Sequence, residues 1–294
     1  MNASISVYIG LNLHMKMATQ VLLNLLVLGL SSPALAVCHL GCPLSLRDAA
    51  ESPHRVIERS FYSLSNNAKT KFADWVAYTV TPDSIGPTQA RQWKRDPDLP
   101  ASETLSPADY KDASAALKID RGHQAPLASF TSLPDWQQAN YLSNITPQAS
   151  ALNQGPWERL ESAERTLVRR SNANIHVVTG PLYERAMEPL PKATKDHVVP
   201  SGYWKVVLAE QGSGIATAAF VMHQDTPRSA DYCNHAVPIA DIEKRIMLRL
   251  FPEMADVDWG PQAYGPGRLL EALGCKIITD AQTGVRIVSV RNAE

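Results

Sequence analysis

Apolar runs rich in β-branched and aromatic residues predict a sheet. Val56–Leu64 and Phe72–Val80 are two such runs, and the polar stretch Ser65–Asn67 between them predicts a hairpin turn. Val285–Val290, near the end of the chain, also has the composition of a strand. Three further runs are separated by turn-forming residues and predict buried strands: Ile175–Val178, Tyr203–Leu208 and Thr217–Met222.

Helical spacing of apolar residues occurs in three places. Ala108–Leu117 and Ile239–Leu250 are two predicted helices. A third is predicted to begin at Gly155–Trp157, because proline suits the first helical turn, and to continue to Arg170. The mixture predicts an α+β domain with an antiparallel sheet. The residues expected on the buried side of the third helix are Trp157, Leu160, Leu167 and Val168.

The N-terminus has the three regions of a secretory signal peptide. Lys16 precedes the apolar run Val21–Leu30, and Ala34–Ala36 provides the small residues of a cleavage site. The run is too short to span a bilayer, which needs about 20 apolar residues. We expect residues 1–36 to be a leader, with translation starting at Met1, Met15 or Met17. Residues 37–294 would then form one secreted, extracellular domain with no membrane association.

Four cysteines follow the leader, as expected for an oxidising compartment. They are Cys38, Cys42, Cys233 and Cys275, which allow three pairings. Proximity in sequence favours Cys38 with Cys42 and Cys233 with Cys275. Zinc is not favoured, because no Cys-x-x-Cys pair is present.

The formal net charge of −1 argues against a broadly basic surface for nucleic acid. Any attraction to phosphate must be local. Two clusters of cations are candidates, with solvated surface charge as the alternative interpretation: Arg91, Lys94 and Arg95 in one, and Arg165, Arg169 and Arg170 in the other.

Polar residues in the middle of the chain have the chemistry of phosphodiester cleavage. Asp120–His123 supplies an imidazole that can take a proton, and Asn153 supplies an amide oxygen for a cation. Glu161 and Arg165 are four residues apart, so they lie on one face of the third helix. Taken alone, these two residues are better explained as an ordinary helix ion pair.

The order and spacing of these residues resemble the DNA/RNA non-specific endonuclease family of the Serratia nuclease type. The match covers Cys38 to Cys275, thins between Phe251 and Leu270, and is close enough to indicate a near relative of the nuclease that gives the type its name. The tail after Cys275 has no counterpart in it. The segments that carry the resemblance are Phe72–Tyr78, Arg91–Lys94, Asp120–Pro126, Asn144–Gln148, Asn153–Glu161, Arg165, Thr179–Tyr183 and Tyr203–Lys205.

The resemblance implies the ββα-metal (His-Me finger) fold, in which a six-stranded antiparallel sheet lies between helices, and also a homodimer. Carried across by position, it makes His123 the general base and Asn153 the direct protein ligand of one Mg²⁺, with Mn²⁺ as an alternative metal. Glu161 would hold metal-bound water. One such amide ligand is chemically sufficient, since Mg²⁺ usually keeps several waters.

The same resemblance assigns phosphate contacts to Arg91 and Arg165, substrate orientation to Arg121, and orientation of the site to Asn144. It implies hydrolysis of DNA and RNA, single- or double-stranded, to oligonucleotides with 5′-phosphates. Contacts to phosphate do not read base sequence, so we expect weak sequence preference. A phosphodiesterase on small nucleotides and a non-enzymatic nucleic-acid-binding protein are the alternatives.

Overall fold

The computed structural model describes residues 38, 40–46, 54–211, 214–254, 268–279 and 286–290. The chain divides into two units, Met1–Ala36 and Val37–Glu294, and the described residues all belong to the second. The expected leader lies outside the described residues and stays a prediction. Among the described residues, no helix combines the length and apolar character needed to cross a membrane.

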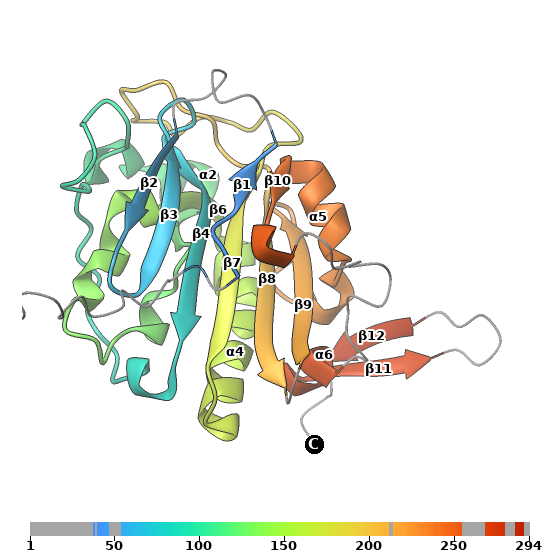
Figure 1. Ribbon diagram of the computed structural model, residues 1–294. Coiled ribbons are helices and arrows are strands. Elements are labelled where there is room, and N and C mark those ends of the chain that lie inside the picture. Colours follow the sequence, from blue (N-terminus) through green and yellow to red (C-terminus); the bar gives the residue numbers. More distant parts are fainter. Residues whose placement is uncertain are drawn as a thin grey trace, which may run out of the picture. The chain divides into compact units, whose positions relative to one another are not determined.

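A six-stranded antiparallel sheet forms the centre of the second unit (Figure 1). Its strand order is β2-β3-β4-β7-β8-β9, and each neighbouring pair is antiparallel. The predicted α+β class with a central antiparallel sheet is therefore confirmed. The strands are β2 (His54–Glu58), β3 (Tyr62–Asn67), β4 (Phe72–Val80), β7 (Ile175–Leu182), β8 (Gly202–Gln211) and β9 (Gly214–His223).

Both faces of this sheet are buried, because alternate residues of its strands enter different hydrophobic clusters. In β4, Val76 and Tyr78 belong to the cluster that contains Trp157 and Leu160. Trp75 and Ala77 belong to the cluster that contains apolar residues of a different helix. Helix α4 (Glu158–Ser171) thus covers one face and helix α5 (Ile239–Ile246) the other, as implied for this fold.

A separate hairpin carries the predicted motif. Strand β5 (Ile119–His123) pairs with β6 (Ile145–Ala149), and His123 lies opposite Ile145 at its end. After β6 the chain forms a helical turn, α3 (Ser150–Leu152), then a π-turn at Asn153–Trp157, and then α4. This strand–strand–helix unit brings the start of β5 beside the π-turn, and His123 at the end of β5 lines the same cavity as residues of α4.

Two of the sequence-based boundaries were wrong in the first sheet. Val56–Leu64 is not one strand, because the chain turns at Arg59 and Ser60 between β2 and β3. Ser65–Asn67 is not the turn but the end of β3, and its asparagines are buried. The side-chain nitrogen of each has a partner inside the fold: Asn66 donates to the carbonyl of Glu103, and Asn67 to the carboxylate of Asp74. Buried polar groups with partners are compatible with a strand.

The predicted helices are also interrupted. Ala108–Leu117 is split into a 3₁₀ turn and α2 (Ala113–Leu117), because Asp112 has a left-handed φ of 64°. Ile239–Leu250 ends at Met247, where φ is 57°, and Leu248–Arg249 is a strand, β10. The third helix begins where predicted: Gly155 has non-helical φ and ψ angles of −121° and −118°, and this kink separates α3 from the helix that has Pro156 in its first turn. Its predicted buried side is confirmed.

The remaining elements are short. Strand β1 (Leu44–Ser45) pairs with β10, and β11 (Cys275–Thr279) pairs with β12 (Arg286–Val290), which confirms the C-terminal strand. Helix α6 (Arg268–Ala272) precedes β11. The described 3₁₀ turns are Pro82–Ser84, Pro107–Tyr110, Leu127–Ser129, Trp136–Asn140, Leu142–Asn144, Tyr232–His235 and Pro252–Met254.

The cysteines pair as proximity favoured. Cys38 is bonded to Cys42, and Cys233 to Cys275, with Cα–Cα distances of 4.9 Å and 5.7 Å. The second bond closes a loop of 42 residues and ties the turn after β9 to strand β11. On the chain-entropy model such a loop contributes roughly 4 kcal/mol to stability.

Candidate active site

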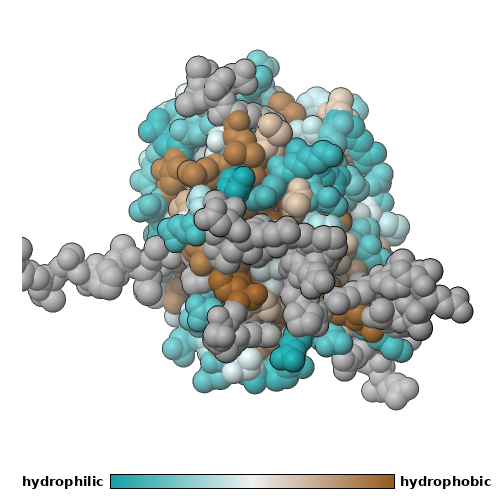
Figure 2. Space-filling model, turned by 45° about the vertical axis from the view of Figure 1, so that its right-hand side comes forward, coloured by the Kyte–Doolittle hydropathy of each residue, from teal (hydrophilic) through white to brown (hydrophobic). Residues whose placement is uncertain are grey.

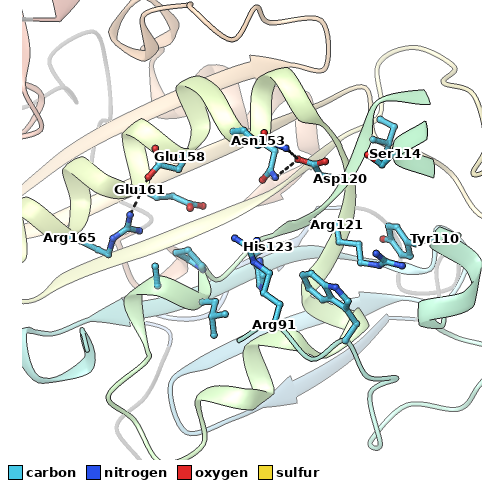
Figure 3. Close-up of a pocket in the computed structure, with 16 residues that line it drawn as sticks. Arg91, Tyr110, Ser114, Asp120, Arg121, His123, Asn153, Glu158, Glu161 and Arg165 are labelled. Atoms are coloured by element: carbon cyan, nitrogen blue, oxygen red, sulfur yellow. Dashed lines mark hydrogen bonds and ion pairs between the residues drawn. The ribbon is translucent and has the colours of Figure 1, made fainter. Parts of the chain in front are cut away.

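A cavity of about 700 Å³ lies between β5, the π-turn and the first two turns of α4. Arginine, carboxylate and imidazole groups share its wall (Figure 3), where α4 residues face His123 and Arg91 from the opposite side. Six of the seven residues predicted for the site line this one cavity: Arg91, Arg121, His123, Asn153, Glu161 and Arg165.

His123 is held at the end of β5 by its neighbours in the hairpin. Gly122 is required beside it, because a Cβ there would come within 2.3 Å of the Gln148 amide oxygen on β6. The ring packs against Trp93, with the two centroids 5.1 Å apart. Nε2 lies 3.2 Å from the Asn140 side-chain oxygen, and with that oxygen as acceptor the neutral ring keeps its lone pair on Nδ1.

Burial lowers the pKa of His123 to about 4; the hydrogen bond to Asn140 opposes this shift, and the charge of Arg91 adds to it. The imidazole is therefore neutral at pH 7. A neutral ring with a free lone pair can accept a proton, which is the state that a general base requires.

Asn144 does not line the cavity. Its carboxamide is fully buried and makes three bonds: it accepts from the amide of Ala125 at 2.8 Å and donates to the carbonyls of Ala125 and Ala139. Its own carbonyl accepts from the amide of Gln124. Asn144 thus holds the segment that follows His123, as a positioning residue behind the cavity wall.

Asn153 is oriented by Asp120, a residue of the same motif. Its side-chain amide donates to Asp120 at 2.9 Å, which leaves the carbonyl oxygen Oδ1 for another partner. Asp120 also accepts from Ser150 and Gln154, so one carboxylate holds α3 and the first two residues of the π-turn. Figure 3 shows Asp120 beside Asn153. The direction of the Asn153 carboxamide is therefore set by the start of β5.

Arg121 lies at the other end of the cavity from α4 (Figure 3). Its guanidinium is 5.7 Å from the centroid of the Trp93 ring and 5.3 Å from that of Tyr110, and it donates to the carbonyl of Pro107. Stacking between two rings fixes the plane of the group. The charge of Arg121 is thus presented in one direction.

Arg165 and Glu161 do not form the ordinary ion pair that their spacing allows. Arg165 instead lies 3.6 Å from Glu158 (Figure 3), while Glu161 lies 3.6 Å from the ammonium of Lys205. Burial raises the pKa of Glu161 to about 7; Lys205 opposes that shift, and Glu164 adds to it. Two residues on one helical face thus have different partners.

Five residues that matter to this geometry were not given a role from the sequence. Asp120 had a signal, since it stands in the matched motif. Glu164 also had one, because a carboxylate on the buried stripe of a helix needs a buried partner. Trp93 and Lys205 also stand in segments that carry the resemblance, but their partners are set by the tertiary fold. Nothing in the local sequence distinguishes Asn140.

Comparison with known proteins agrees with this geometry. A family model described as DNA/RNA non-specific endonuclease matches residues 47–256. A nuclease of Serratia marcescens is 47% identical over 241 residues, which cover 81% of this chain and 89% of that protein. Mitochondrial endonuclease G of Bos taurus is 31% identical over 67% of this chain and 69% of its own length.

The fold has a counterpart among solved structures. A chain in the crystal structure of an EndoG/EndoGI complex superposes with a TM-score of 0.59 at 23% identity, covering 68% of this chain and 87% of that chain. The ββα-metal nuclease fold implied by the sequence is thereby confirmed. The chain belongs to the DNA/RNA non-specific endonuclease family, as a close relative of the Serratia nuclease, and is a nuclease.

Proposed function

We propose that this protein is an endonuclease that hydrolyses phosphodiester bonds of DNA and RNA, single- or double-stranded, to oligonucleotides with 5′-phosphates. One observation carries this proposal: a neutral imidazole, an oriented carboxamide and three guanidinium groups line the same cavity. Both alternatives are weaker. The cavity has a proton acceptor that mere binding does not need, and its volume does not restrict it to small nucleotides.

The side chains suit an in-line attack of water on phosphorus. His123 would take the proton of the attacking water on Nδ1, and a phosphate close to the ring would raise its pKa towards the useful range. Arg91 and Arg165 would neutralise charge on the phosphoryl oxygens, with Arg121 orienting the chain of the substrate. These contacts address phosphate and sugar rather than base edges.

The residues fit a hard divalent cation, which we propose to be Mg²⁺ with Mn²⁺ as a substitute. Asn153 Oδ1 would hold it directly and Glu161 through water. In support, Asn153 and Glu161 line the same cavity and offer the oxygen atoms that a hard cation and its waters prefer. The described residues contain no group of three His, Cys, Asp or Glu side chains that could hold a metal, so the ion would keep most of its waters. When bound, such a cation supplies positive charge for the leaving oxyanion.

We further propose that the protein acts outside the cell, after loss of residues 1–36, as one domain of residues 37–294. Two disulfides support an oxidising compartment. A homodimer is a further proposal from the family resemblance. N-terminal sequencing of the exported protein and its sedimentation coefficient test these points.

His123→Ala is the decisive test of the proposed activity. Plasmid and RNA digestion by the wild-type protein should need a divalent cation and stop on chelation. Loss of the general base should lower kcat by about 10²–10⁴-fold, with the fold and substrate affinity retained. Equal rates for the variant and the wild type would remove His123 from this role, and a preference for dinucleotides over polymers would favour the small-nucleotide alternative.

A further inference from the structure

Lys205 is the one lysine that the described structure buries completely beneath the cavity. It lies in the middle of β8, opposite Thr179 and Phe220, where the sheet is covered by α4. Its ammonium is 3.1 Å from Glu164, 3.6 Å from Glu161 and 4.7 Å from the centroid of the Trp157 ring. The lysine therefore contacts two carboxylates one helical turn apart.

The two carboxylates differ in what they face. Glu161 lines the cavity and keeps 13% of its side chain exposed, whereas Glu164 is fully buried and does not line it. Lys205 thus pairs with one carboxylate at the cavity wall, Glu161, and with one in the core, Glu164. A buried ammonium is costly unless it is paired, so its position between the two acids is strongly specified.

Without Lys205, two other charged groups would decide where the Glu161 carboxylate lies. Arg165 is four residues away on the same face, and repulsion from Glu164 pushes the carboxylate outwards. Neither contact of Lys205 has hydrogen-bond geometry within the described structure, so the ammonium acts as a point charge that attracts both acids. With Glu161 drawn towards Lys205, Arg165 pairs with the exposed Glu158 instead of Glu161, and it lines the cavity.

We propose that Lys205 is a positioning residue for cleavage: its ammonium fixes the Glu161 carboxylate at the cavity wall and keeps Arg165 available for substrate. This inference rests on the proposed function of the cavity and goes beyond it by adding a residue that touches neither substrate nor cation. The rival explanation is that Lys205 only anchors α4 on the sheet.

Replacing Lys205 alone would leave two buried carboxylates unpaired and could unfold the protein. The comparison is therefore made in a Glu164→Gln background. With all three groups ionised, the cluster of Glu161, Glu164 and Lys205 carries one net negative charge in the wild type. The double variant Glu164→Gln/Lys205→Met keeps that net charge, because it removes one negative and one positive group. Glu164→Gln alone keeps the ammonium next to Glu161, and is the matched control with near wild-type kcat.

The double variant should lose about 10–100-fold in kcat relative to this control, the usual effect of removing an outer-shell partner. Its affinity for Mg²⁺ alone, measured by isothermal titration calorimetry without substrate, should fall as well. Denaturant unfolding establishes that both variants are folded. If the methionine variant does not fold, Lys205→Gln in the same background replaces it with the same expectation.

A double-mutant cycle separates positioning from anchoring. When Glu161→Gln is added to the Glu164→Gln background, which removes the group that Lys205 positions, Lys205→Met should change kcat by no more than about twofold. Equal losses with and without the Glu161→Gln substitution, or an unchanged Mg²⁺ affinity, would overturn the proposal in favour of anchoring. Inactivity of the wild-type protein would instead refute the proposed function.

Discussion

At the scale of single residues, the site depends on groups whose state is set by neighbours. His123 combines a partly buried ring, a hydrogen bond to Asn140 and a nearby arginine, and each affects the proton that the ring must accept. Asn153 has one amide hydrogen committed to Asp120, which decides where its oxygen points. The chemistry of the cavity is thus determined by residues beside it as much as by those in it.

The low pKa of His123 can be measured in the metal-free protein. We expect the ring to titrate near pH 4, well below the ordinary 6.5, because burial disfavours the charged form. Since the neutral ring is the base, its protonation should not limit kcat/KM, which reports the free enzyme, above about pH 5. NMR titration of the ring resonances measures this directly, and Asn140→Ala should lower the pKa further. A midpoint near 6.5 would contradict the described burial of the ring.

At the scale of elements, the π-turn is the part that places Asn153. Residues 227–231 pack across it: Arg159 donates to the carbonyls of Arg228 and Ala230, and Arg228 donates to Gln154. Gly155 allows this close approach, because a Cβ there would lie 2.7 Å from the Arg228 carbonyl oxygen and 2.9 Å from its Cα. Backbone atoms cannot move aside as a flexible side chain can.

Gly155→Ala should therefore push the turn and residues 227–231 apart. We expect a loss of about 1–3 kcal/mol in the free energy of unfolding, as for other overpacked sites. Because the same movement displaces Asn153, kcat and Mg²⁺ affinity should also fall. Denaturant unfolding and calorimetry measure these effects, with Ser162→Ala on α4 as the control. Wild-type stability in the variant would mean that the turn tolerates a side chain.

The elements also show what sequence can predict. Strand composition located β4, β7, β8 and β9, because their residues are buried on both faces and read as apolar runs. The break at Asp112 and the end of α5 at Met247 were missed, since non-glycine residues in the left-handed region are set by tertiary contacts. Six of the residues that the motif predicts for the site line one cavity, while the ion-pair partner of Glu161, Lys205, comes from β8, far away in sequence.

At the scale of the whole molecule, positive and negative charges nearly balance, although three arginines line the cavity. The net charge is −1, and hydrophilic residues dominate the outline of the face in Figure 2, with apolar patches inside it. Large apolar side chains exposed among the described residues include Leu44, Leu46 and Met247, all on or next to β1 and β10. Attraction for nucleic acid is therefore local to the cavity rather than spread over the surface.

Salt should weaken substrate binding only moderately. If Arg91 and Arg165 neutralise about two phosphates, raising monovalent salt from about 50 to about 200 mM should raise KM about tenfold, with little change in kcat. Arg165→Gln should lower the slope of log KM against log salt concentration by about one unit. Steady-state rates on DNA of mixed sequence measure it. A slope several times steeper would indicate a wider basic contact surface than the cavity provides.

The complete burial of the Asn144 carboxamide has a practical consequence. Asn144-Ile145-Thr146 has the sequence of an N-glycosylation acceptor, yet the side-chain nitrogen that would bear the sugar already donates to two carbonyls inside the protein. A glycan added there before folding has no room in the native core and would prevent the loop after His123 from closing. Production in a host that does not glycosylate secreted asparagines avoids this misfolding.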